Sequence, residues 1–163
     1  MTQLVNSEHE ECQDHLCDED CPCETTDFVI DHAALQEYAK ELFGVELPLT
    51  VIRRQQKLDE RTGMYSVARD CNGHMRYKFD ADTNTIASIR ITVVSGRSAK
   101  ETLKTIAHEF QHVKQLLDLG PVELRNAYKR AREAFEEEAI KAERHWLDMG
   151  GILKLRKQRR TND

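Results

Sequence analysis

The sequence lacks the features that mark membrane and secreted proteins. None of its apolar runs approaches the roughly 20 residues that a transmembrane helix needs, and the mean hydropathy is −0.67. The first 12 residues contain neither the basic nor the apolar segment of a signal peptide. Apolar periodicity is present but changes character along the chain, which excludes a collagen-like, coiled-coil or wholly disordered protein. We therefore expect a cytoplasmic globular protein with no membrane partner, whose 163 residues can bury the core of one domain.

Positive charge is missing from the first part of the chain. Residues 1–39 carry 11 acids and no Lys or Arg, although the whole chain has 24 Lys and Arg against 29 Asp and Glu. The rest of the chain therefore carries a net charge of +6, and residues 151–163 form a basic tail. Such a tail can contact nucleic acid or an acidic partner. We favour the simpler interpretation of a solvated, frayed terminus.

Cysteine is scarce outside the head of the chain, which we define as residues 1–27. The head contains four of the five cysteines, and the fifth is Cys71. The four are Cys12, Cys17, Cys21 and Cys23. An odd number argues against a disulfide framework. With His9 and His15 nearby, the four could hold a structural zinc ion, although their spacing is not that of common zinc fingers. We expect the head to be either organised by metal or disordered.

Apolar periodicity predicts a helix followed by short strands. Residues 32–43 have helical spacing, with Asp31 as the N-cap and Gly44 as the stop. The next segments are short and rich in β-branched residues. Strands are expected at residues 49–53, 64–69, 74–79 and 86–94. The pair Asn72-Gly73 predicts that the second and third of these form a hairpin.

Two long helices are expected after the strands. Ser98 and Glu101 form a capping box at the start of the first helix, and Gly120-Pro121 ends it. The second covers residues 122–149. Helices and strands that are segregated in this way predict an α+β domain over residues 28–150, with helices packed on one face of a small, mostly antiparallel sheet.

The first long helix contains the motif HEFQH at residues 108–112. His108 and His112 are four residues apart and share one helix face, so both imidazoles can bind one zinc ion. Glu109 can take a proton from a water whose pKa the metal lowers to about 7. It can then return that proton to a leaving nitrogen after the water attacks an amide carbonyl. The motif predicts a zinc-dependent peptidase with a polypeptide substrate, and its long helical context argues against a chance match.

The third protein ligand is expected on the second long helix. The carboxylates and imidazole available there are Glu133, Glu136, Glu137, Glu138 and His145. At 100° per residue, Glu137 points away from the apolar stripe, Glu138 lies inside it and Glu136 lies at its edge. An edge position suits a cleft between core and solvent. Periodicity alone slightly favours Glu138, because a carboxylate in a buried stripe needs a partner.

The motif and the acidic run at residues 135–139 together resemble the gluzincins, in particular small phage and bacterial HExxH metallopeptidases such as the ImmA/IrrE-like group. Those families place the ligand Glu in an E-x-x-A pattern, which Glu136 and Ala139 match. The resemblance therefore implies zinc held by His108, His112 and Glu136, with Glu138 as the alternative. It also implies a zincin-like fold in which an edge strand lines the substrate cleft, and we assign residues 86–94 to that strand.

The chain departs from this family at one position. Its relatives often carry Asp or Asn after that Ala to orient the first His, whereas this chain has Ile140. A metal-bound His normally needs such a partner. Tyr128 and His145 are candidates for stabilising an oxyanion, but Tyr128 also fits the apolar stripe, and we expect it in the core.

Two other functions are kept as alternatives. The basic tail favours a DNA-associated metalloprotease or regulator, whose affinity for DNA would depend on salt. A non-catalytic zincin-like module could instead bind a partner, with the head as a metal-dependent arm. The intact Glu109 argues against the second alternative, because a binding module has no chemical need for a base.

Overall fold

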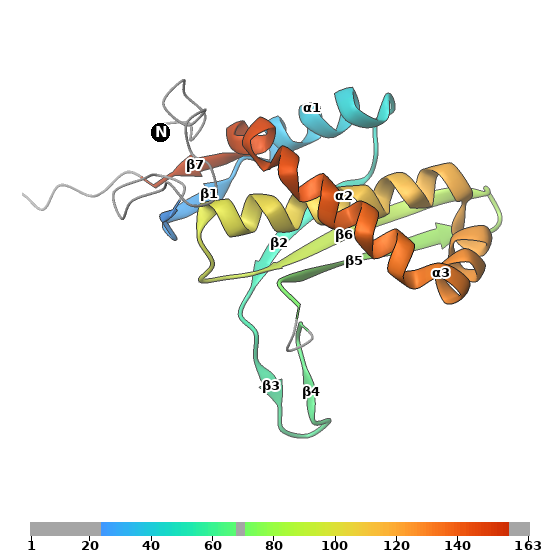
Figure 1. Cartoon of the computed structure of the whole chain (residues 1–163), viewed down its shortest axis with the longest axis horizontal. Coiled ribbons are helices and arrows are strands. Elements are labelled where there is room, and N and C mark those ends of the chain that lie inside the picture. The colour runs from blue at the N-terminus through green and yellow to red at the C-terminus, as the bar shows by residue number, and fades with distance from the viewer. Residues whose placement is uncertain (1–23, 68–70, 157–163) are drawn as a thin grey trace, which may run out of the picture.

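The chain passes through short strands before its two longest helices (Figure 1). The computed structural model describes residues 24–67 and 71–156. The elements in chain order are β1 (Phe28–Ile30), α1 (His32–Phe43), β2 (Leu49–Arg54), β3 (Leu58–Asp59), β4 (Met64–Tyr65), β5 (Gly73–Asp80), β6 (Thr85–Val94), α2 (Ala99–Leu119), α3 (Pro121–Ala142), the 3₁₀ helix η3 (Glu143–Ile152) and β7 (Leu153–Leu155). These residues form an α+β domain, as expected. Within them, no helix is both long enough and apolar enough to cross a membrane.

β6 is the central strand of a three-stranded sheet with the order β2-β6-β5. β2 runs parallel to it, and β5 runs antiparallel to it. The pairs β1–β7 and β3–β4 are also antiparallel. The assignment of residues 86–94 to an edge strand is wrong, because β6 is hydrogen-bonded on both sides. The edge position that matters for the site is taken by β5 instead.

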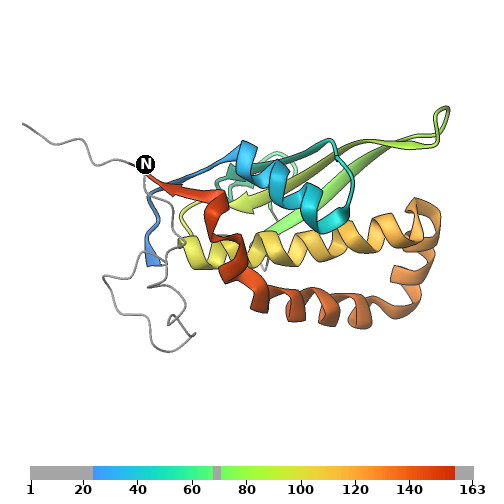
Figure 2. The same cartoon turned by 90° about the horizontal axis from the view of Figure 1, so that it is seen from above.

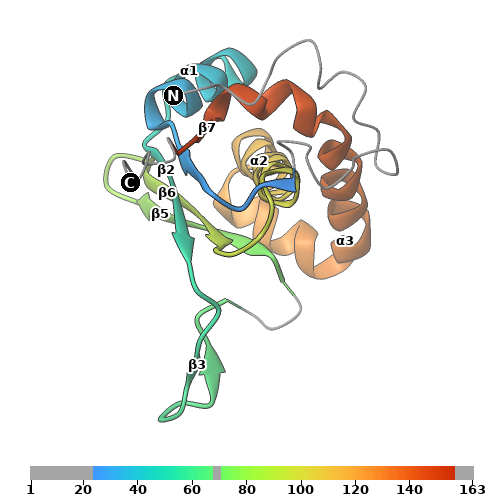
Figure 3. The ribbon, with the colours of Figure 1, turned by 90° about the vertical axis from the view of Figure 1, so that its left-hand side faces the viewer.

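The hairpin predicted around Asn72-Gly73 is also wrong. Among the described residues, β4 pairs with β3, and together they form an arm that projects from the domain (Figures 1 and 3). Gly73 is the first residue of β5 and not part of a turn. A Cβ at this position would lie 2.5 Å from the carbonyl oxygen of Thr92 and 2.6 Å from Cγ2 of Thr105. Glycine is therefore needed here for the close approach of β5 to α2.

Local capping residues set the ends of α1 and the start of α2. Asp31 accepts hydrogen bonds from two backbone N–H groups in the first turn of α1, and Gly44 ends that helix with φ of 74°. Ser98 Oγ accepts from the backbone N–H of Glu101 at 3.1 Å. These caps confirm both predicted helix starts, because each depends on residues within one turn of the chain.

α2 lies between the sheet and α3 (Figures 2 and 3). One face of it is buried against β6 in the core. The main side chains of this contact are Leu103, Ile106, Phe110 and Val113 of α2 and Ile89, Ile91 and Val93 of β6. Burying a side chain of this kind contributes about 1.5–3 kcal/mol. Because this face holds α2 against the sheet, the opposite face, with residues 108, 112 and 115, is directed toward α3.

The last part of the chain is not the single helix expected at residues 122–149. α3 runs back along α2 (Figure 2), but Ala131 has non-helical dihedral angles of −139° and 41°. After Ala142 the chain tightens into η3, which buries Trp146, Met149 and Ile152. Ala139 is the one buried residue of α3, so the predicted apolar stripe is mostly at the margin of the core.

β7 closes the domain by pairing with β1, with Leu155 opposite Phe28. Lys154 Nζ also lies 2.6 Å from a carboxylate oxygen of Asp31. η3 continues through residues 150 and 151, between which we expected the domain boundary, and β7 follows it. The rest of the basic tail, from residue 157, lies outside the described residues, as do Cys12, Cys17, Cys21 and Cys23 of the head.

Candidate metal centre

The structure brings together the imidazoles of the HEFQH motif and one carboxylate of α3. His108 Nε2 lies 3.2 Å from Oε2 of Glu136, and His112 Nε2 lies 3.5 Å from Oε1 of the same side chain. One ligand atom from each residue lies within 4.8 Å of the other two. Among the described residues, no other group of three potential ligands converges in this way. Two imidazole nitrogens and one carboxylate oxygen are a donor set that suits zinc.

Gln115 contacts the His112 imidazole at Nδ1, the ring nitrogen that does not face Glu136. Its Oε1 lies 2.8 Å from Nδ1 of His112, while its Nε2 donates to the carbonyl oxygen of Phe135 and to Oε2 of Glu138. Because an amide oxygen only accepts, Nδ1 of His112 donates in this contact, and in the neutral tautomer that this favours Nε2 has a lone pair for a metal ion. Gln115 is 4% exposed, so its amide group is shielded from water, whereas Glu138 is exposed. Sequence reasoning missed this network, although Gln115 lies one turn after His112 on the same helix face.

Glu143 lies near Nδ1 of His108, the ring nitrogen that does not face Glu136. One of its carboxylate oxygens lies 4.0 Å from Nδ1 of His108. Ile140, the residue after Ala139, is 56% exposed. Glu143 follows it at the start of η3, and burial raises the pKa of its carboxyl group. The change from α3 to η3 thus places an acidic side chain near His108 that the sequence pattern does not indicate.

Tyr128 belongs to the cluster and not to the core, where we expected it. Its hydroxyl donates a 2.6 Å hydrogen bond to Oε1 of Glu136. Desolvation works to raise the pKa of Glu136, but this hydrogen bond and the two imidazoles outweigh it and lower that pKa below its ordinary value. The carboxylate is therefore held in the ionised form that a metal ligand needs.

The pKa values of His108 and Glu109, two neighbouring side chains of the motif, are shifted in opposite directions. Burial, followed by the neighbouring His112, lowers the pKa of His108 and keeps its ring neutral. Glu109 is only 6% exposed. Burial and the charge of Glu136 raise the pKa of Glu109 to about 8. A carboxyl group with a pKa near neutrality can both take up and release a proton.

The cluster lies at the bottom of a cleft of about 570 Å³. α2 forms its floor, the edge strand β5 forms one wall and the first half of α3 forms the other. The wall residues are Gly73, His74, Met75 and Tyr77 of β5 and Leu124, Arg125, Tyr128, Lys129 and Arg132 of α3. Cys71, an exposed free thiol, lies at the mouth. An extended polypeptide could reach the cluster along the free edge of β5.

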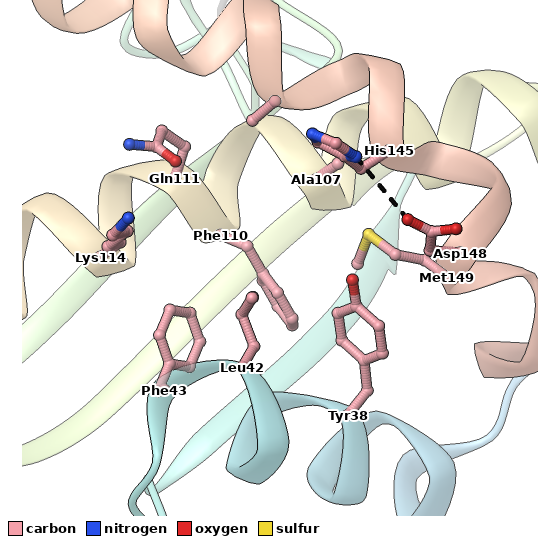
Figure 4. A pocket seen from close by; sticks show the side chains of 11 residues that line it. Tyr38, Leu42, Phe43, Ala107, Phe110, Gln111, Lys114, His145, Asp148 and Met149 are labelled. Atoms are coloured by element: carbon pink, nitrogen blue, oxygen red, sulfur yellow. Dashed lines mark ion pairs between the residues drawn. The ribbon is translucent and has the colours of Figure 1, made fainter.

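The remaining candidates on the second long helix lie elsewhere. His145 borders a different cavity of about 340 Å³, between α1, α2 and η3, where its Nδ1 is 3.7 Å from Asp148 (Figure 4). It is therefore not placed to stabilise an oxyanion in the cleft. Glu138 has a partner in Gln115, and Glu133 and Glu137 are exposed outside the cluster.

Comparison with known proteins adds no relative. The chain matches no protein-family model, no curated protein and no solved structure. The likeness to gluzincins therefore rests on HEFQH and on the carboxylate that α3 brings beside it.

Proposed function

We propose that this protein is a zinc-dependent metallopeptidase of the gluzincin type, with a zincin-like fold. The observation that carries the proposal is the convergence of Nε2 of His108, Nε2 of His112 and the Glu136 carboxylate within 4.8 Å. The first two come from one helix and the third from its neighbour. A solvated acidic patch would not place two imidazoles, those of His108 and His112, against the single carboxylate of Glu136.

The charge state of these side chains supports zinc. The lowered pKa of His108 favours a neutral ring, and the hydrogen bond of His112 Nδ1 to Gln115 favours the tautomer with a lone pair on Nε2. Zinc would take the place of the proton that His108 Nε2 shares with Glu136. Glu136 supplies one negative charge. Bound there, zinc would supply a Lewis acid that acidifies water and polarises a carbonyl group.

Glu109 is proposed as the general base. It follows the first ligand on α2 and lines the same cleft. Its carboxylate would accept a proton from the attacking water and return it to the nitrogen of the departing amine. The burial that raises its pKa also excludes bulk water, which would otherwise compete for that proton.

β5 is proposed to bind the substrate backbone. Its outer edge has no strand neighbour among the described residues. A peptide that pairs with this edge would form backbone hydrogen bonds with β5, and one of its peptide bonds would then lie above α2. The Tyr128 hydroxyl donates to Glu136 and so orients the carboxylate ligand.

Glu109→Gln is the variant that tests the proposal. Glutamine keeps the shape of the side chain but cannot take up a proton at neutral pH, so we expect zinc binding to persist and peptide hydrolysis to be lost. Zinc content is measured by mass spectrometry and hydrolysis on a fluorogenic peptide library. If both proteins hold zinc and cleave equally, Glu109 is not the base.

A further inference from the structure

The wall of the cleft that α3 contributes is cationic. Arg125, Lys129 and Arg132 line the cleft and are exposed to solvent. Among the described residues, no carboxylate forms an ion pair with any of them. Arg132 lies over the Tyr128 ring, with Cζ 5.9 Å from its centroid, and is thereby held beside the cluster.

Among the residues that the structure describes, the opposite wall of the cleft contains no carboxylate, because β5 contributes Gly73, His74, Met75 and Tyr77. His74 lies on β5 at the cleft, where burial and then the charges of Arg76 and Arg54 lower its pKa. The carboxyl groups that line the cleft are Glu109 of the HEFQH motif and Glu136 of the cluster. An occupant that extends along the cleft therefore meets positive charge along the α3 wall and no carboxylate among the described residues of the β5 wall.

The spacing of the cations suits an extended chain. The helical rise places Arg125 and Lys129 about 6 Å apart along α3. Alternate side chains of a strand, which share one face, are about 6.7 Å apart. A peptide paired with β5 would thus present every second side chain to the cleft at nearly the interval of these cations.

We infer that the substrate is an extended polypeptide segment with acidic side chains at alternate positions, and that Arg125, Lys129 and Arg132 select it. The inference rests on the proposed peptidase function and specifies its substrate class. A nucleic acid is the less suitable occupant, because its sugar-phosphate backbone has no N–H groups and could not pair with the hydrogen-bonding edge of β5.

Binding is measured separately from cleavage to test the inference. The full chain carrying Glu109→Gln is titrated, with zinc and with EDTA, into two fluorescent 12-residue peptides that differ only in Glu or Gln at every second position. At low salt we expect the acidic peptide to bind roughly tenfold more tightly, since three exposed ion pairs contribute modestly. The preference should shrink at high salt because the pairs are screened.

Three triple variants locate the effect. R125Q/K129Q/R132Q should reduce the preference to less than twofold, whereas R130Q/K141Q/R144Q, which removes equal charge outside the cleft, should keep it. R125K/K129R/R132K should also keep it, and thermal unfolding checks that each variant is folded. Equal binding of the two peptides, or equal loss in both charge-removing variants, would overturn the inference.

Cleavage by the wild-type protein separates the two proposals. If the acidic peptide binds selectively but no peptide is cleaved, the peptidase proposal fails and the selectivity stands. If both peptides are bound and cleaved equally, the selectivity fails and the peptidase stands. If a single-stranded oligonucleotide displaces the acidic peptide with higher affinity, and the cleft variant abolishes this, the wall binds nucleic acid and the inference is overturned.

Discussion

The hydroxyl of Tyr128 donates a 2.6 Å hydrogen bond to Oε1 of Glu136, although eight residues separate them on one helix. In a regular α-helix this separation is about 12 Å along the axis, beyond the reach of a tyrosine to a glutamate. The non-helical dihedral angles of Ala131 break α3 between them. The kink therefore brings Tyr128 back to the cluster.

Tyr128→Phe is expected to weaken zinc binding roughly tenfold, within the range for partners of metal ligands. The phenol helps to hold the pKa of Glu136 below its ordinary value, so its removal raises that pKa. Affinity is measured by competition with a chelator. Tyr38→Phe, which lies at the other cavity, is the control and should bind zinc as the wild type does.

Gln115→Ala is expected to weaken zinc binding roughly 10- to 100-fold, because Nδ1 of His112 loses its acceptor and the ring is no longer fixed. The variant also leaves the Phe135 carbonyl and Glu138 without their donor. Gln111→Ala makes the same change on α2 at the other cavity. Equal losses in both variants would contradict a specific role for Gln115.

Gly73→Ala is expected to lower the free energy of unfolding by about 1–3 kcal/mol, because the added methyl group cannot be accommodated without a shift of β5. It would lie 2.5 Å from the Thr92 carbonyl oxygen, which is backbone and cannot rotate away. Gly151→Ala is the matched control, since a Cβ there meets nothing within 4 Å. Urea denaturation compares the two, and equal stability would show that β5 is not held close to α2.

The ion pair that closes the domain predicts a pH dependence of stability. The hydrogen bond from Lys154, followed by that from the Ala34 N–H, lowers the pKa of Asp31 below its ordinary value of 3.8. The contribution of Asp31 is therefore fully present above that ordinary pKa and is lost as the pH falls through the lower, folded-state pKa.

Lys154→Met should accordingly be less stable than the wild type at pH 7, and the difference should shrink as the pH falls below about 4. Urea midpoints at several pH values measure this. Lys40→Met removes a partner from an exposed pair with Glu46 and should change stability little at any pH. A difference for Lys154→Met that grows in acid would contradict the assignment.

The elements that the sequence predicted well are those controlled by neighbouring residues. Asp31 and Gly44 act within one turn of α1, and Ser98 acts within one turn of α2, so their effects are local. Asn72-Gly73 misled the prediction because its glycine is required by Thr92 and Thr105, which are distant in sequence. The break at Ala131 is likewise not indicated by any local sequence pattern.

The residues of the candidate site were likewise predictable from the sequence only in part. The spacing of His108 and His112 indicates two ligands on one helix face without any tertiary information. The choice of Glu136 over Glu138 came from resemblance, whereas periodicity slightly favoured the residue that contacts Gln115. The contacts of Glu143 and Tyr128 depend on η3 and on the kink, so the sequence alone could not assign them.

Zinc content in the absence of the head cysteines tests the central claim most directly. The full chain is prepared with C12S/C17S/C21S/C23S, so that any zinc that the head binds does not contribute, and is combined with His108→Ala, Glu136→Ala or Glu138→Ala. We predict one tightly bound zinc ion per chain in the parent and in Glu138→Ala, and none in His108→Ala or Glu136→Ala. A parent that binds no zinc, or a Glu136→Ala variant that retains it while Glu138→Ala loses it, would contradict the proposed centre.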